Sequence, residues 1–359
     1  MADVLALDGT GRAELAGEEL RELYRLMVAV RHLDESAIRW QRQGLIPGYA
    51  PQLGQEAAQV GSGYALDMSR DFVFPTYREM GVARTVGVDM VEYMSTHKAT
   101  WHGGLYDPKA SRFAPIQAVV GGSVLHAVGW AHGQTLDGTP AGELGVAITY
   151  FGDGASSQGD VHEAMNFAAV MKAPVVFFIQ NNGWAISVPT ERQVAGGSVA
   201  GRAAGYGMPS IQVDGNDVVA VTQATATALA HARAGNGPAV VEAMTYRRGP
   251  HSTSDDPGRY RTLEEERTDG GEDPLARMRT RLLADVELPL VYVLAELERT
   301  GVAVDVEQLE GLEAHFAGEV KKAADEAFDV IGKEINLGSP KQLQVVLFDE
   351  LNMPKTKRT

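Results

Sequence analysis

The stretch ITYFGDGASSQGDVHEAMNFAAVMKAPVVFFIQNNGWAIS, residues 148–187, decides the fold class. A β-rich apolar run over 146–151 leads into a glycine turn, and the residues that follow predict an amphipathic helix over about 158–171. Pro174 opens a second apolar strand, 175–179, which ends at paired asparagines. This order predicts a βαβ unit with polar groups at the carboxyl ends of two parallel strands, where open α/β sheets bind ligands.

Oxygen-bearing groups stand at both of these strand ends. Asp153 offers a carboxylate oxygen, Asn182 an amide oxygen, and the turn after it a main-chain carbonyl at Trp184. Three such oxygens, with waters or phosphates completing an octahedron, suit a Mg²⁺ ion that holds a diphosphate. Gly152 and Gly154 predict a close approach of the backbone to that ligand. Each motif alone is also compatible with an ordinary turn. Because the two motifs stand at the ends of neighbouring strands, a ligand-binding site is favoured.

The GDG and NN motifs, 26 residues apart, resemble the motif that binds thiamine diphosphate (ThDP). The segment GDGASSQGDVHEAMNFAAV is similar to the α subunit of the E1 component of 2-oxo acid dehydrogenases, and the resemblance extends over about residues 15–284. It implies an α/β fold that binds ThDP and Mg²⁺, with a mostly parallel sheet flanked by helices. Helical spacing elsewhere predicts helices over 18–43, 123–136 and 217–234.

The resemblance also implies an activity and partners. Such a chain takes part in the oxidative decarboxylation of a 2-oxo acid, and the acyl group passes to the lipoyl group of an E2 acyltransferase. The glutamate that protonates the ThDP pyrimidine comes from the E1 β subunit, so the chain is half of an active site in an α₂β₂ assembly. The segments HSTSDD and TWHGGL favour a branched-chain 2-oxo acid as substrate, with pyruvate second.

Individual site residues follow from the same resemblance. Arg78, in the YRE segment, is implied to bind phosphate oxygens with its guanidinium fork, and a surface pair with Glu79 or Asp71 is the alternative. His102 and His251 are implied to be catalytic, and His251 belongs to a mobile loop, 246–261, that closes over the cofactor. Val120 is implied to bend it. The residues implied to contact the cofactor are Tyr77, Arg78, Val120, Gly152, Asp153, Gly154, Ala155, Asn182, Ile186, Arg247 and His251.

Three further positions keep two interpretations open. Glu56 is either a first-turn carboxylate favoured by the helix dipole or a residue near the cofactor. Branched-chain relatives build a potassium site where this chain has Gly122 and Ser123, which speaks against a monovalent-cation site. Ser252 stands where mitochondrial relatives are phosphorylated, and a simple turn residue is the preferred interpretation because nothing in the sequence implies a kinase.

Composition narrows the class of protein. The chain has 359 residues, of which 44% are hydrophobic, a formal net charge of −15 and no cysteine. The acidic balance argues against a nucleic-acid surface, and the absence of cysteine leaves no disulfide and no thiolate ligand. Neither a membrane-spanning run nor a signal peptide is evident. We therefore expect a cytoplasmic bacterial enzyme that binds neither nucleic acid nor membrane.

The chain changes character near residue 285. From Val286 it resembles an internal fragment of bacterial DNA polymerase I, without the palm carboxylates that hold metal for nucleotidyl transfer. These 74 residues carry 8 Lys and Arg against 14 Asp and Glu, a net charge of −6. We expect two domains, 1–284 (E1 α-like and truncated at its C-terminus) and 285–359 (a helical extension). A fusion of this kind raises the alternative of a less stable chain that fails to assemble and is inactive.

Overall fold

Two parallel strands joined by one helix form the centre of the fold. The computed structural model describes residues 15–98, 105–300 and 306–354. In it β2 (Ala147–Gly152) leads through a short turn to α7 (Gly159–Met171) and then to β3 (Val175–Asn181). The side chain of Gln158 caps α7 by accepting a hydrogen bond from the backbone N–H of Asp160 at 2.7 Å. The predicted βαβ unit is confirmed, and its helix begins within one residue of the expected position.

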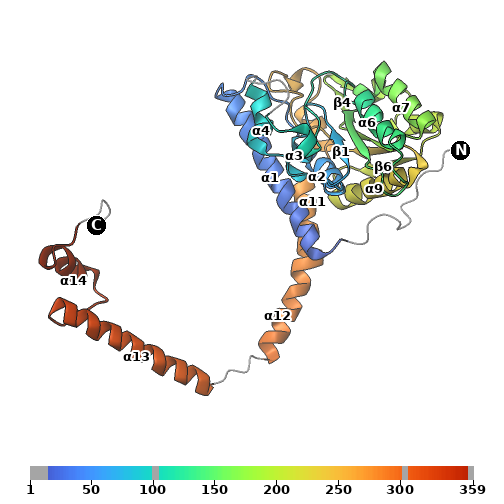
Figure 1. The fold of residues 1–359 in the computed structure, drawn as a ribbon. Helices are drawn as coiled ribbons and strands as arrows, with labels where there is room; N and C mark the ends of the chain where they lie inside the picture. The colour runs from blue at the N-terminus through green and yellow to red at the C-terminus, as the bar shows by residue number, and fades with distance from the viewer. Residues whose placement is uncertain (1–14, 99–104, 301–305, 355–359) are drawn as a thin grey trace. The chain divides into compact units, whose positions relative to one another are not determined.

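The central pair is extended into a five-stranded sheet in the order β1-β2-β3-β7-β6. Its outer strands are β1 (Phe72–Phe74), β7 (Ala239–Met244) and β6 (Ser210–Asp214). Every neighbouring pair is parallel, and Gly152 is paired with Gln180, so the carboxyl ends of β2 and β3 meet at one edge. The expected α/β class with a parallel sheet flanked by helices is confirmed (Figure 1).

Helices cover both faces of the sheet. Successive side chains of a strand point to opposite faces, so strands that are apolar throughout present apolar side chains on both faces, and both must be covered. Phe151 and Phe177 pack on one face with α6 (Val124–Leu136) and α7. Tyr150 and Phe178 pack on the other face with α9 (Val218–His231). A third apolar cluster joins three more helices, α1 (Gly17–Arg42), α2 (Glu56–Tyr64) and α11 (Pro274–Leu282).

Shorter elements complete this part of the chain. The remaining helices are α3 (Met80–Thr85), α4 (Met90–Ser95), α5 (Pro108–Ser111), α8 (Ala200–Ala203) and α10 (Leu263–Asp269). Two two-residue strands, β4 (Trp184–Ala185) and β5 (Val188–Pro189), form an antiparallel hairpin directly after β3. Short 3₁₀ turns are η1 (Thr96–Lys98), η2 (Ala155–Ser157), η3 (Thr190–Arg192), η4 (Ala204–Tyr206) and η6 (Pro257–Arg259), and η5 (Ala232–Asn236) and η7 (Leu283–Glu287) are π-helical.

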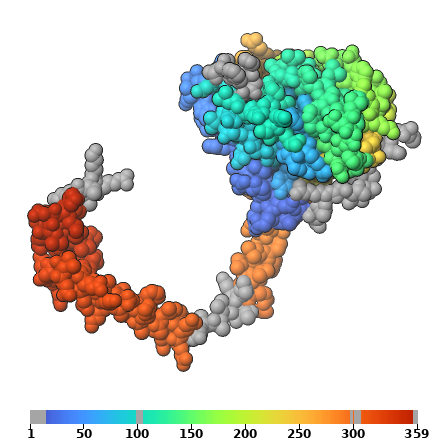
Figure 2. Space-filling view, in the orientation of Figure 1, coloured from blue at the N-terminus to red at the C-terminus, as the bar shows by residue number. Residues whose placement is uncertain are grey.

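The chain divides into two units, Met1–Leu290 and Val291–Thr359. Figure 2 shows the first unit as one packed body. The boundary expected from the sequence, between residues 284 and 285, marks where the two sequence resemblances meet. That boundary stays a prediction. Within the described residues, no helix combines the length and apolarity needed to cross a membrane.

The second unit is helical, as the sequence predicts. It contains most of α12 (Leu288–Thr300), then α13 (Val306–Ile331), α14 (Pro340–Gln344) and the turn η8 (Val345–Glu350). Ser339 caps α14. Apolar side chains are exposed along α13, at Leu309, Leu312, Phe316, Val320 and Val330.

Candidate functional site

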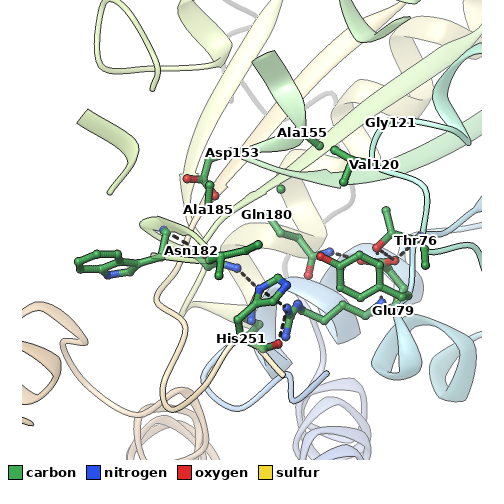
Figure 3. A pocket seen from close by; sticks show the side chains of 18 of the residues that line it. Thr76, Glu79, Val120, Gly121, Asp153, Ala155, Gln180, Asn182, Ala185 and His251 are labelled. Atoms are coloured by element: carbon green, nitrogen blue, oxygen red, sulfur yellow. Dashed lines mark hydrogen bonds between the residues drawn. The ribbon is translucent and has the colours of Figure 1, made fainter. Parts of the chain in front are cut away.

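A cavity of about 410 Å³ lies at the carboxyl ends of β2 and β3 (Figure 3). This is the position that the sequence predicts for a ligand site, and open α/β sheets bind ligands there. The lining residues are Gln55, Thr76, Tyr77, Arg78, Glu79, Ala118, Val119, Val120, Gly121, Gly152, Asp153, Gly154, Ala155, Gln180, Asn182, Trp184, Ala185, Ile186 and His251. The fold therefore brings together ten of the residues implied to contact the cofactor, Arg247 being the exception.

The GDG turn places a buried carboxylate at one wall of the cavity. Asp153 Oδ2 accepts hydrogen bonds from Thr190 Oγ1 at 2.5 Å and from Gln193 Nε2 at 2.7 Å. Burial raises the pKa of the Asp153 carboxyl above its usual range. A cation in the cavity would compensate that burial, since an opposite charge favours the ionised form.

The second glycine of the motif is required by a contact within the protein. A Cβ on Gly154 would lie 2.6 Å from the Cβ of Ala185 in β4, whereas one on Gly152 would meet nothing closer than 3.8 Å. The absence of a side chain at Gly154 thus lets the β4–β5 hairpin approach the turn. The sequence interpretation, a close approach to the ligand, did not anticipate this contact.

The two asparagines at the end of β3 have different surroundings. Asn181 donates from Nδ2 to Glu242 Oε1 at 2.9 Å and does not line the cavity. Asn182 does line it, and its Oδ1 accepts from the backbone N–H of Trp184 at 3.3 Å while its Nδ2 donates to Gln55 Oε1 at 3.2 Å. The amide oxygen of Asn182 and the turn at Trp184 therefore lie at the same cavity as Asp153.

Arg78 and His251 form one side of the cavity, and Arg78 carries its positive charge. Arg78 is buried, and one guanidinium nitrogen lies 2.9 Å from the carbonyl oxygen of His251 and 3.1 Å from its Nδ1. The other binds the carbonyl of Pro51. Burial and the Arg78 charge lower the pKa of His251 to about 4, so the imidazole is neutral at pH 7. Because the guanidinium can only donate, Nδ1 is the acceptor and the ring proton is on Nε2.

Tyr77 stands beside this pair, with its ring centroid 6.0 Å from that of His251 in an edge-on arrangement. The loop that carries His251 is tied to the rest of the unit: the backbone N–H of Thr253 donates to the carbonyl of Tyr49 at 2.8 Å. Asp255 accepts from the backbone N–H of His251 at 2.7 Å and from the Tyr260 hydroxyl at 2.6 Å. These bonds hold the imidazole against the cavity.

Arg247 is fully buried and does not line the cavity. Its guanidinium donates to the carbonyls of Ile186 at 2.7 Å and of Trp184 at 3.4 Å, and to the Tyr260 hydroxyl at 2.8 Å. In this structure it therefore supports the turn after Asn182 and makes no contact at the cavity surface. Ile186 needs that support because its φ of 55° is unfavourable for a β-branched residue.

Two polar residues at the centre of the cavity were not singled out from the sequence. Glu79 is fully buried and accepts from Thr76 Oγ1 at 2.6 Å and from Gln180 Nε2 at 2.7 Å, and burial raises the pKa of its carboxyl. The Oε1 atom of Gln180 is buried and has no hydrogen-bond partner within the described residues. The end of β3 could have marked Gln180, because it is the last residue but one of the strand and lies two positions before Asn182.

Other predicted residues lie elsewhere. Glu56 accepts from Arg31 at 2.5 Å and from the backbone N–H of Gly54 at 3.0 Å, and it does not line the cavity. His102 lies outside the described residues. Val120 and Ile186 present apolar, half-exposed side chains to the cavity.

The donor set suits a hard cation. No group of three or more His, Cys, Asp or Glu gathers to hold a metal in the part of the chain that the structure describes. At the ends of β2 and β3 the cavity instead offers the carboxylate of Asp153, the amide oxygen of Asn182 and the turn at Trp184 with its main-chain carbonyl, and such mixed oxygen sets suit Mg²⁺ together with phosphate oxygens. The residues present thus fit a metal-bound diphosphate.

A parallel α/β domain with oxygen donors and an arginine at the carboxyl ends of two central strands belongs to the class of α/β enzymes that bind phosphorylated ligands. The comparison with known families makes this specific. The dehydrogenase E1 component family matches residues 24–286, and the chain belongs to that family, whose members use thiamine diphosphate. Residues 287–359 lie outside the match.

The individual relatives are named for two different dehydrogenases. The chain is 49% identical over 283 residues to the 3-methyl-2-oxobutanoate dehydrogenase subunit alpha of Mycobacterium tuberculosis, covering 77% of this chain and 75% of the relative. It is 43% identical over 272 residues to the pyruvate dehydrogenase E1 component subunit alpha of Staphylococcus epidermidis, covering 76% and 72%. The Staphylococcus aureus subunit with that name is 43% identical over 267 residues, with 74% and 70% covered.

Proposed function

We propose that this chain is the α subunit of an E1 enzyme that decarboxylates a 2-oxo acid oxidatively and passes the acyl group to the lipoyl group of an E2 acyltransferase. The observation that carries the proposal is the cavity in which Asp153, Asn182 and Arg78 meet, in a chain of the E1 family. The relative with the higher identity is named for a branched-chain 2-oxo acid, which makes that class the first choice and pyruvate the second.

The lining residues have separable roles in this proposal. Asp153, Asn182 Oδ1 and the carbonyl of Trp184 would hold Mg²⁺, which would supply positive charge to the diphosphate. Arg78 and the Nε2–H of His251 would donate to phosphate oxygens. When bound, ThDP supplies the nucleophilic carbon and the electron sink that decarboxylation needs.

Other residues shape and complete the site. Val120 and Ile186 exclude water from one side of the cavity and favour a bent cofactor. His102 would act near the substrate carbonyl. A carboxylate from an E1 β subunit would complete the site for the pyrimidine ring, so the active unit is an α₂β₂ assembly in the bacterial cytoplasm.

The decisive experiment measures binding and turnover with the β subunit present. Calorimetry of ThDP into the α–β assembly should show Mg²⁺-dependent binding, and Asp153→Ala should abolish it. Decarboxylation of 3-methyl-2-oxobutanoate and of pyruvate should then be compared by kcat/KM, with the branched-chain acid preferred. One methylene in an apolar pocket changes the free energy of discrimination by only about 1–3 kcal/mol, so a preference of about 10- to 200-fold is expected.

A second candidate is an inactive chain, which the exposed apolar side chains of α13 favour. Under that alternative the chain does not assemble with the β subunit and ThDP shifts no melting temperature. Salt-sensitive binding of DNA would instead support a role for the segment that resembles a polymerase.

A further inference from the structure

Thr190 touches both halves of the proposed cation site. It follows β5 and opens the turn η3. Its Oγ1 lies 2.5 Å from Asp153 Oδ2 and 3.2 Å from Asn181 Oδ1, and its backbone N–H donates to the carbonyl of Gly183 at 3.0 Å. The hydroxyl has one hydrogen, and the shorter distance assigns it to Asp153. One residue thus links the end of β2 to the turn that carries Asn182.

A second donor and a buried anchor reinforce this link. Gln193, the residue after η3, donates from Nε2 to the same oxygen of Asp153 at 2.7 Å. Asn181 is in turn fixed by Glu242 of β7, which also accepts from Ser198 Oγ at 2.7 Å and from two backbone N–H groups at the start of α8, each at 3.0 Å. Burial alone would raise the pKa of Glu242, but these hydrogen bonds hold it below its usual range.

The geometry has a chemical consequence for Asp153. Its Oδ2 is occupied by two donors from the protein, so the carboxylate cannot rotate without breaking both bonds. A rigid carboxylate matters most to Mg²⁺, which demands nearly ideal octahedral geometry, and less to Ca²⁺, which accepts flexible coordination. Groups that orient a metal ligand in this way tune both affinity and selectivity.

We propose that Thr190, assisted by Gln193, is a positioning residue that orients Asp153 and the Asn182 turn for Mg²⁺. The inference rests on the proposed function, since it supposes that the cavity binds Mg²⁺ with a diphosphate. It adds to that function a part for Thr190 and Gln193, which do not line the cavity themselves.

The test compares two substitutions at one position. Thr190→Val keeps the shape and removes the hydroxyl, whereas Thr190→Ser keeps the hydroxyl. Mg²⁺ is titrated calorimetrically into the full chain assembled with its β subunit at saturating ThDP. We expect the Kd for Mg²⁺ to rise about 10- to 100-fold in Thr190→Val and less than about threefold in Thr190→Ser. Thr268→Val, which removes an exposed hydroxyl on α10, is the matched control and should leave the Kd unchanged.

Selectivity separates positioning from a general loss of structure. The same titration with Ca²⁺ should show a smaller increase of Kd, so that Thr190→Val lowers the preference for Mg²⁺ over Ca²⁺. An unchanged Mg²⁺ Kd in Thr190→Val would overturn the inference, as would an equal loss for both ions accompanied by a lower melting temperature of the metal-free protein. If the unsubstituted assembly shows no Mg²⁺-dependent binding of ThDP, the proposed function itself is wrong.

Discussion

Asp153 is the one carboxylate among the three proposed metal ligands, and burial already raises its pKa. For Asp153→Asn we expect opposite effects on binding and on stability. The Kd for Mg²⁺ should rise by more than about 100-fold, since a lost ligand costs more than a lost orienting partner. The metal-free protein should unfold at the same temperature or higher, because a buried charge has been removed. Calorimetry and thermal unfolding without metal check both parts; a large stability loss would contradict the second.

Asp34 predicts a pH dependence from a carboxyl that does not line the cavity. It is buried, its Oδ1 accepts from the Tyr49 hydroxyl at 2.6 Å and from the backbone N–H of Gln52 at 3.0 Å, and burial raises its pKa to about 6. A raised pKa contributes stability that is present below the unfolded value and is lost as pH rises through about 6. Asp34→Asn should therefore gain stability relative to the unsubstituted chain as pH rises from 4 to 7, measured by urea unfolding.

His251 predicts the opposite sign over the same range. Its pKa is lowered to about 4, so the unfolded chain binds more protons below the ordinary histidine value of 6.5. Stability contributed by the neutral imidazole is full above pH 6.5 and is lost as pH falls toward 4. We expect His251→Gln to flatten this acid-side loss in urea unfolding. A variant with the acid-side slope of the unsubstituted chain would show that His251 is not the group responsible.

At the scale of elements, the contact between the GDG turn and β4 gives a prediction with its own rescue. Gly154→Ala places a Cβ 2.6 Å from that of Ala185, and we expect a loss of about 1–3 kcal/mol in the free energy of unfolding. Ala185→Gly removes the opposing carbon, so the double variant should recover most of that loss. Urea unfolding of both single variants and the double variant checks the coupling, and purely additive losses would contradict it.

Elements with a long apolar period could be predicted from the sequence, and those fixed by tertiary contacts could not. The helix α7 and the strands on either side could be located closely because the helix is amphipathic and the strands are short continuous apolar runs, bounded by Pro174 on one side and by the glycine turn and the asparagines on the other. The hairpin β4–β5 was missed, since strands of two residues carry no period. For the same reason no sequence pattern marks Thr190, although a motif marks its hydrogen-bond partner Asp153.

The position of Arg247 shows a second limit of sequence reasoning. A motif places a residue at a point in the chain, but the direction of its side chain depends on which acceptors the fold leaves open. The carbonyls of Ile186 and Trp184 are such acceptors, and they hold the guanidinium behind the cavity wall. Gln180 is the converse case: the fold brings it to the centre of the cavity although no motif marked it.

At the scale of the whole molecule, the first unit should be stable without the second. Within the described residues, every side chain of the three apolar clusters lies at or before Val286. None of them comes from beyond Leu290, where the second unit begins. Ending the chain after Leu290 should therefore change the melting temperature by less than about 3 °C, the shift expected for roughly 1 kcal/mol in a unit of this size. Thermal unfolding of the shortened chain checks this, and a loss of cooperative unfolding would contradict it.

The strand order also determines how long β3 lacks one of its neighbours while the chain is synthesised. β3 lies between β2 and β7 in the sheet, yet β7 ends at Met244, 63 residues after β3 ends at Asn181. At about 5–20 residues per second the ribosome needs roughly 3 to 13 s to deliver that neighbour. During this interval the nascent chain exposes an apolar parallel edge, which is a template for aggregation. Yield in a cell should thus depend on how well chaperones shield β3 until β7 emerges.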